Sequence, residues 1–150
     1  MDLQNSQESA AEDARLLVLC TQRIHVFFQC LDERRYEELI GYFAQDGRWL
    51  RQGRWLHGRS LIRDALSERP ASQATCHIMS NAHIREKTRE AVTVEAYMTA
   101  YRHDHAAEGS VPMLSGPFRI NQVTTVFDVQ ALGLFIVEQR MLPRFDFAAR

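Results

Sequence analysis

An alternation of apolar and polar residues over Ala74–Tyr101 constrains the fold of this chain more than any other feature. In ATCHIMSNAHIREKTREAVTVEAYMTAY, two alternating runs flank the charged segment Glu86–Glu90. Alternate residues of a strand point to opposite faces of a sheet, and the Val, Thr and Tyr content favours strand over helix. The segment therefore predicts two long antiparallel strands joined by a charged turn, with His77, Met79 and Asn81 on one face.

Helical periodicity dominates the chain before these strands. From about Glu8 to Leu31, apolar residues recur every three or four positions and form one stripe, which predicts a long helix. A short second helix is expected from Tyr36, ending in a turn at Gln45–Gly47. A hairpin is expected over Arg48–His57, followed by a third helix that begins near Ser60.

More sheet is predicted toward the C-terminus. The Val- and Thr-rich residues 118–129 predict a third long strand, and Leu134–Leu142 a last one that Pro143 ends. Apolar residues on both faces of the last strand indicate a central position in the sheet. Helices followed by an antiparallel sheet make the fold class α+β, in a single domain over 1–150. Residues 1–7 have nothing to bury and are expected to be disordered.

Composition narrows the classes of partner. A net charge of −1 with interspersed signs argues against nucleic-acid binding, which needs a basic stripe. The apolar runs are too short to span a bilayer, and residues 1–13 do not resemble a signal peptide, so we expect a cytoplasmic protein without membrane contact. Three cysteines lack metal spacing, and His103-Asp104-His105 lacks a third ligand. The sequence also has no glycine-rich phosphate-binding loop, so we predict no metal and no cofactor.

The expected sheet suggests a cup that holds His77. A twisted sheet covered by three helices leaves a cavity at its open end, where we expect His77 to meet Asp32 from the end of the first helix. Imidazole can take a proton near neutral pH, and a carboxylate on its other nitrogen fixes the tautomer and stabilises the imidazolium. Such a pair suits abstraction of a C–H proton. Two alternatives stay open: Asp32 can cap the second helix, and His77 can be a core histidine bonded to a neighbour.

Six further residues are candidates for contacts with a substrate in the cup. Each also has a structural interpretation, because aromatic side chains usually fill cores and an arginine can form a surface ion pair. The six are Tyr36, Trp49, Tyr97, Phe27, Met79 and Arg140.

Four segments of the chain carry a resemblance to a known family: LDERRYEEL from Leu31, YFAQDG from Tyr42, His57-Gly58, and CHIMSN from Cys76. Together with the element order, they resemble the NTF2-like superfamily and, within it, the SnoaL-like group. The resemblance implies a cone-shaped barrel, a curved antiparallel sheet wrapped around N-terminal helices. In the branch of scytalone dehydratase and hexachlorocyclohexane dehydrochlorinase, an Asp after the first helix pairs with a His on the first long strand. Asp32 and His77 match these positions.

The same segments also resemble the small subunit of ring-hydroxylating dioxygenases, where the domain is a structural partner. We therefore expect a small cofactor-independent lyase or isomerase that takes a proton from an apolar, carbonyl-bearing small molecule. The alternative is a non-catalytic subunit or ligand-binding protein. Both branches imply a homodimer or homotrimer through the outer sheet face. If they are not core, the interface candidates are Val92, Val94, Ala96 and Met98.

Overall fold

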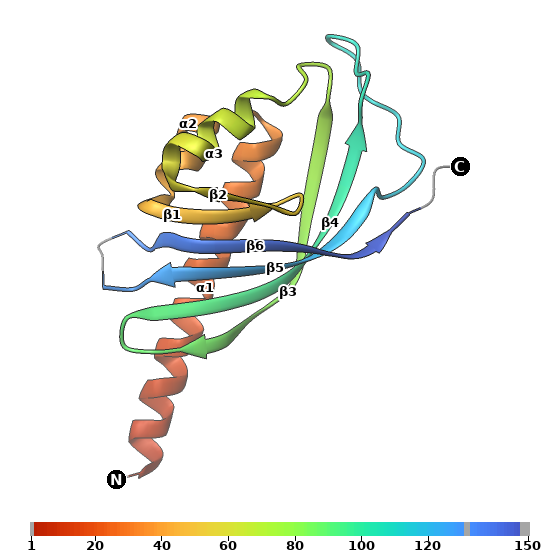
Figure 1. Ribbon diagram of the computed structural model, residues 1–150. Helices are drawn as coiled ribbons and strands as arrows, with labels where there is room; N and C mark the ends of the chain where they lie inside the picture. The colour runs from red at the N-terminus through yellow and green to blue at the C-terminus, as the bar shows by residue number, and fades with distance from the viewer. Residues whose placement is uncertain (1, 131–132, 148–150) are drawn as a thin grey trace.

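Three helices and six strands make up the part of the chain that the computed structural model describes, residues 2–130 and 133–147 (Figure 1). The helices lie mostly before the sheet in the chain, which confirms the predicted α+β class. In order, the elements are α1 (Asp2–Asp32), α2 (Tyr36–Gly41), β1 (Phe43–Arg51), β2 (Arg54–His57), α3 (Gly58–Ser67), β3 (Ala74–Lys87), β4 (Ala91–His103), β5 (Arg119–Asp128) and β6 (Phe135–Asp146).

The strands form one curved sheet in the order β2-β1-β6-β5-β4-β3. Neighbouring strands run antiparallel, except that β1 and β6 pair in parallel. The position of β6 between β1 and β5 confirms that the last strand is central. Within the described ranges, β2 and β3 are edge strands that do not pair with each other. The sheet is therefore an open, curved layer rather than a closed barrel.

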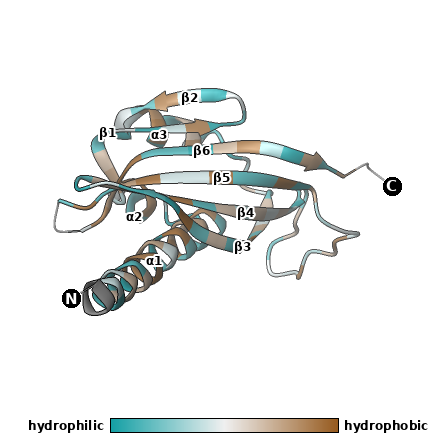
Figure 2. Cartoon of the chain, turned by 90° about the horizontal axis from the view of Figure 1, so that it is seen from below, coloured by the Kyte–Doolittle hydropathy of each residue, from teal (hydrophilic) through white to brown (hydrophobic). Residues whose placement is uncertain are grey.

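The core lies between one face of this sheet and the helices. Figure 2 shows α1 and α2 on the same side of the strands, and the apolar stripe of α1 supplies Ile24, Phe27 and Phe28 to the core. Burial of such side chains is the main force that holds the layers together. The four interface candidates are at most 4% exposed and face this core, so they are wrong as an outer surface: Val92, Val94, Ala96 and Met98.

The first helix is longer than the sequence predicts. It has 31 residues and begins at Asp2, so residues 2–7, which we expected to be disordered, continue the helix; Met1 lies outside the described residues. This start is physically reasonable because the segment contains no Gly or Pro and places acidic residues near the positive end of the helix dipole. None of the helices described is both long and apolar enough to cross a membrane.

Asn81 interrupts the alternation of β3. Its φ of 56° is left-handed, and the register with β4 shifts at this point. Such a bulge adds one residue to a strand and reverses the faces of the residues that follow. His77 and Met79 therefore share the helix-facing side, whereas Asn81 is exposed and Ile84 packs against the core. The expectation that Asn81 lies on the face of His77 is wrong.

Two predicted chain breaks are continuous strand. At Gln45–Gly47, expected to be a turn, β1 runs on because Gly47 has no Cβ; one would lie 2.7 Å from the carbonyl oxygen of Ile136. The last strand also continues beyond Pro143. Pairing of β6 with β1 ends at Arg140, so the missing N–H of the proline lies along a stretch where only β5 is a neighbour.

Candidate active site

The carboxylate of Asp32 is held by three hydrogen bonds from β3. Its Oδ1 lies 2.6 Å from His77 Nδ1 and accepts a hydrogen bond of 2.7 Å from Thr75 Oγ1, while its Oδ2 accepts one of 2.9 Å from the backbone N–H of His77. A carboxylate only accepts hydrogen bonds, so Nδ1 of the imidazole is the donor. Nε2 then carries the lone pair, and it makes no hydrogen bond within the described ranges.

Two arginines fix the end of α1 against the segment that leads into β3. Arg69 donates to the carbonyl of Leu31 at 2.6 Å and to Thr75 Oγ1 at 2.9 Å. Arg34, left-handed with φ of 60°, donates to the carbonyl of Gln73 at 2.7 Å. Because the last carbonyls of a helix lack partners within it, the Arg69 contact satisfies one of them at the end of α1, and both arginines hold Asp32 beside β3. Asp32 therefore does not cap α2, whose N-cap residue is Arg35 and has no side-chain cap.

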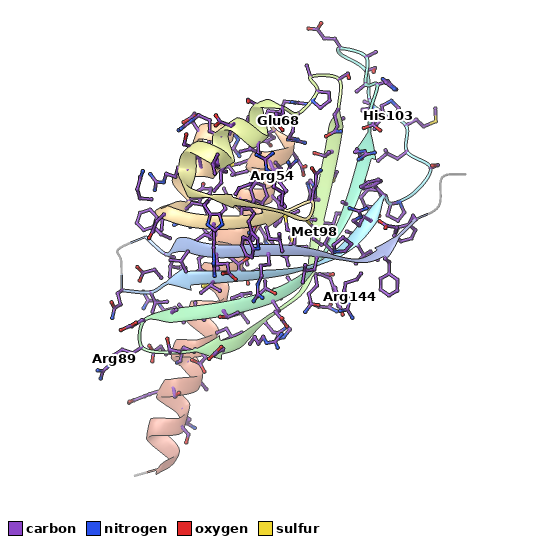
Figure 3. All side chains as sticks on the ribbon, viewed as in Figure 1. Arg54, Glu68, Arg89, Met98, His103 and Arg144 are labelled. Atoms are coloured by element: carbon purple, nitrogen blue, oxygen red, sulfur yellow. The ribbon has the colours of Figure 1, made fainter. Side chains whose placement is uncertain are left out.

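A cavity of about 390 Å³ lies beside the pair. His77 lines it, with only 9% of its side chain exposed. Met98, labelled on β4 in Figure 3, and Met141 on β6 supply apolar walls. Asn121 also lines the cavity, is 5% exposed, and its side-chain amide has no hydrogen-bond partner among the residues described. The lining thus combines apolar surface with a few polar groups, which is typical of a small-molecule site.

The cavity is strongly basic. Four arginines line it, Arg51, Arg69, Arg102 and Arg119, and no Asp or Glu belongs to the lining in the described part of the chain. Burial lowers the pKa of the Arg51 guanidinium below its usual value, and the positive charge of Arg69 lowers it further. A site with this charge attracts anions.

Three of the predicted contact residues lie behind the cavity wall rather than in it. Trp49 and Phe27 are fully buried, with ring centroids 5.4 Å apart, and Trp49 Nε1 donates to Met141 Sδ at 3.2 Å. Tyr36 accepts a hydrogen bond of 2.9 Å from Arg69. Phe27 and Trp49 are therefore core residues, as in their alternative interpretation, and Trp49 and Tyr36 each contact a residue that lines the cavity.

The other three candidates also do not line the cavity. Met79 shares the face of His77 and packs against the core. Tyr97 lies on the opposite face of the sheet and is 39% exposed. Arg140 also lies on that outer face, with its Nε 3.0 Å from Glu138 Oε1, so it forms the surface ion pair that was its alternative. Strand parity explains both placements, because Met98 and Met141, their neighbours in sequence, point inward.

Sequence reasoning missed the lining residues Arg51, Arg69, Asn121 and Met141. For Arg51 a signal existed: in the hairpin Arg-Trp-Leu-Arg it shares the face of Trp49 by alternation. The sequence does not indicate which faces of β5 and β6 point inward, so it does not separate Asn121 and Met141 from outward residues. Arg69 lies just after a helix, where no periodicity indicates its direction.

Comparison with known proteins identifies the family of this domain. A model of the SnoaL-like domain matches residues 19–126. No curated protein matches the chain.

Several solved structures share the fold. A proposed scytalone dehydratase from Novosphingobium aromaticivorans is 15% identical, with 94% of this chain and 93% of that chain covered and a TM-score of 0.72. A protein from Catenulispora acidiphila, in complex with S-DNPA, is 21% identical over 87% of this chain and 94% of its own, with a TM-score of 0.71. The beta subunit of benzoate 1,2-dioxygenase from Burkholderia mallei is 11% identical, with 83% of this chain and 88% of that chain covered and a TM-score of 0.66. At these identities the structures establish the fold alone, whereas the domain model spans most of the chain, which therefore belongs to the SnoaL-like family.

Proposed function

We propose that this protein is a small cofactor-independent lyase or isomerase that removes a C–H proton from a carbonyl-bearing small molecule, with His77 as the base. One observation carries the proposal: the imidazole of His77 lies in a cavity, with Nδ1 bound to Asp32 and Nε2 without a partner among the described residues. This is the arrangement that a general base requires, because one nitrogen is anchored and the other is free to take a proton.

Asp32 supports the base in two ways. Its hydrogen bond to Nδ1 holds the ring in the tautomer that exposes the Nε2 lone pair, and its charge stabilises the imidazolium after proton transfer. The carboxylate is itself oriented by Thr75 Oγ1 and the backbone N–H of His77. Because little of either side chain is exposed, this charge pair is only weakly screened by solvent.

The proton removed from carbon leaves negative charge on the carbonyl oxygen of the substrate. The side-chain amide of Asn121 is suited to donate a hydrogen bond to that oxygen, because it lines the cavity and has no partner within the described ranges. The imidazolium can then return the proton to another carbon, which gives isomerisation, or to a departing hydroxyl, which gives dehydration.

The alternative function is a non-catalytic subunit, as the similarity to a dioxygenase beta subunit suggests. A purely structural domain needs neither an aligned acid–base pair nor a cavity beside it. A filled core with Asp32 and His77 apart would favour that role, whereas the two are in contact beside a 390 Å³ cavity. A homodimer or homotrimer remains a prediction; its surface would have to be the outer sheet face rather than the four core residues named above.

Hydrogen–deuterium exchange at the α-carbon of 2-tetralone in D2O, followed by proton NMR, tests the proposal. This neutral ketone presents an acidic C–H bond and needs no leaving group. We expect the wild-type protein to accelerate exchange and His77→Ala to lose the acceleration. His83→Ala is the matched control, because His83 is on the same strand but exposed outside the cavity. Equal rates for wild type and His77→Ala would refute the assignment of His77 as the base.

A further inference from the structure

Arg51 is a cation in the cavity without an anionic partner. It is the last residue of β1, lines the cavity and is partly buried. Its guanidinium carbon lies 5.5 Å from the centroid of the buried Trp49 ring, which holds the side chain in place. The side chain of Arg51 makes no hydrogen bond or ion pair within residues 2–130 and 133–147.

The other three lining arginines differ from Arg51 because each has an acceptor. Arg69 donates to a backbone carbonyl and to two hydroxyl oxygens. Arg102 Nε lies 3.0 Å from Asp104 Oδ1, and Arg119 Nε lies 2.5 Å from Asp146 Oδ1. Both guanidinium groups also lie over the ring of Phe118, which lines the cavity. These three arginines therefore have structural explanations, and Arg51 does not.

A partly buried charge without a partner is unfavourable for folding alone. Burial and the charge of Arg69 lower the pKa of Arg51, and the smaller, opposite influence of the Glu68 carboxylate does not restore it, which is the expected sign of such a cost. The guanidinium keeps its charge nonetheless, because arginine does not lose its proton in proteins. What would satisfy it is an anion in the cavity, and a planar guanidinium binds a carboxylate through two parallel hydrogen bonds.

We propose that the cavity binds an organic carboxylate, with Arg51 as the residue that recognises the carboxylate group. The apolar body of the ligand would lie against Met98, Ala100 and Met141, which also line the cavity. This inference rests on the proposed function in one respect: the carboxylate belongs to the substrate whose carbon acid faces His77. It changes the expected substrate from a purely apolar ketone to a carbonyl compound that carries an acid group.

Binding of a matched pair of probes tests this proposal without catalysis. 2-Naphthoate is an aromatic carboxylate, and 2-acetonaphthone is a neutral ketone of similar shape; isothermal titration calorimetry measures each. We expect the wild-type protein to bind 2-naphthoate more tightly. In Arg51→Met, the dissociation constant for 2-naphthoate should rise roughly 10- to 100-fold, as expected for loss of a charged hydrogen bond, while that for the ketone should stay unchanged.

Arg54→Met is the control for charge, because Arg54, which is labelled in Figure 3, pairs with Arg51 in the hairpin but is exposed and does not line the cavity. It should bind 2-naphthoate as the wild type does. Arg51→Lys keeps the charge but loses the planar pair of N–H donors, so its dissociation constant for 2-naphthoate should lie between those of the wild type and Arg51→Met. Far-UV circular dichroism melts establish that the variants are folded, and Arg51→Lys keeps the test decisive if Arg51→Met does not fold.

The two proposals can fail separately. Calorimetry of 2-naphthoate compares the wild type with the Arg51 variants, and the exchange of 2-tetralone compares the wild type with His77→Ala, so each proposal has its own measurement. If Arg51→Met binds 2-naphthoate as tightly as wild type, or if the wild type prefers the ketone or binds neither probe, the carboxylate proposal is wrong. The exchange reaction of neutral 2-tetralone does not depend on Arg51, so its outcome decides the role of His77 independently.

Discussion

Replacement of Asp32 by Asn should abolish the base while leaving the fold nearly intact. The wild-type carboxylate accepts from three donors: the Thr75 hydroxyl, His77 Nδ1 and the His77 backbone N–H. An amide has one oxygen, so it cannot accept at both carboxylate positions. With its oxygen on the backbone N–H, its NH2 group would face Thr75 Oγ1 and the imidazole Nδ1, and both of these atoms can accept.

The imidazole would then change tautomer. With Nδ1 accepting from the amide, the proton of the neutral ring moves to Nε2, and the nitrogen that faces the substrate becomes a donor. The equivalent substitution in serine proteases reduces turnover by about 10⁴ through the same loss of tautomer. We expect the exchange rate of 2-tetralone to fall by roughly 10²–10⁴-fold, the range that general-base catalysis contributes. The Thr75 hydroxyl loses the acceptor of its proton, so the free energy of unfolding should fall by about 1–3 kcal/mol.

Nitrogen-15 NMR of the histidine side chains, together with the exchange assay and urea unfolding, measures all three effects. The wild-type ring of His77 should be protonated at Nδ1, and the ring in Asp32→Asn at Nε2. Asp46→Asn is the control, because Asp46 is an exposed residue of β1. Wild-type exchange in Asp32→Asn, or an unchanged tautomer, would refute this account of the pair.

The remaining predictions concern single contacts. Asn121→Leu should slow exchange of 2-tetralone by about 10²–10³-fold, the effect of removing one donor to a developing oxyanion; a smaller loss than that of a control lining variant, Ala100→Val, would argue against the role. Gly47→Ala should lower the free energy of unfolding by roughly 1–3 kcal/mol, because its Cβ would lie 2.7 Å from a backbone oxygen. Gly41→Ala is the control, because a Cβ at that position would have no neighbouring heavy atom within 4 Å. Equal urea midpoints for the two variants would contradict the steric argument. Burial raises the pKa of the Cys20 thiol to about 11, so little thiolate forms at pH 8. A thiol reagent should therefore label the exposed Cys76 before Cys20. Mass spectrometry of the native protein measures the two labelling rates, and equal rates would contradict the prediction.

The alternation of β3 and the stripe of α1 predicted the layers and the inward direction of His77, because both patterns are local. They could not predict the positions where pairing with a distant strand, rather than the local pattern, determines the backbone conformation. The bulge at Asn81 depends on pairing with β4, and a left-handed Asn is only one of several conformations open to that residue. The strand through Gly47 depends in the same way on the approach of β6, which the turn chemistry of Gln45–Gly47 does not reveal.

The site shows the same limit more sharply. Asp32 is as suitable for a helix cap as for a histidine partner, and the choice is made by Arg69, which binds the end of α1 and Thr75 together. Likewise, the sequence indicates that Arg51 is near the core face but not that it lacks an acceptor. The absence of an acceptor is established only when the positions of all neighbouring residues are known. The spacing of residues in the sequence therefore could not predict an unpaired positive charge in the cavity.

In the two proposals, Arg51 and Asp32 act on different parts of one substrate. Asp32 anchors Nδ1 of His77, whereas the side chain of Arg51 lines the same cavity without a hydrogen-bond or ion-pair partner among the described residues. Recognition of an acid group and removal of a C–H proton are therefore carried by separate side chains. On this reasoning Arg51→Met should weaken the binding of an acidic substrate yet leave proton abstraction from a neutral ketone as fast as in the wild type.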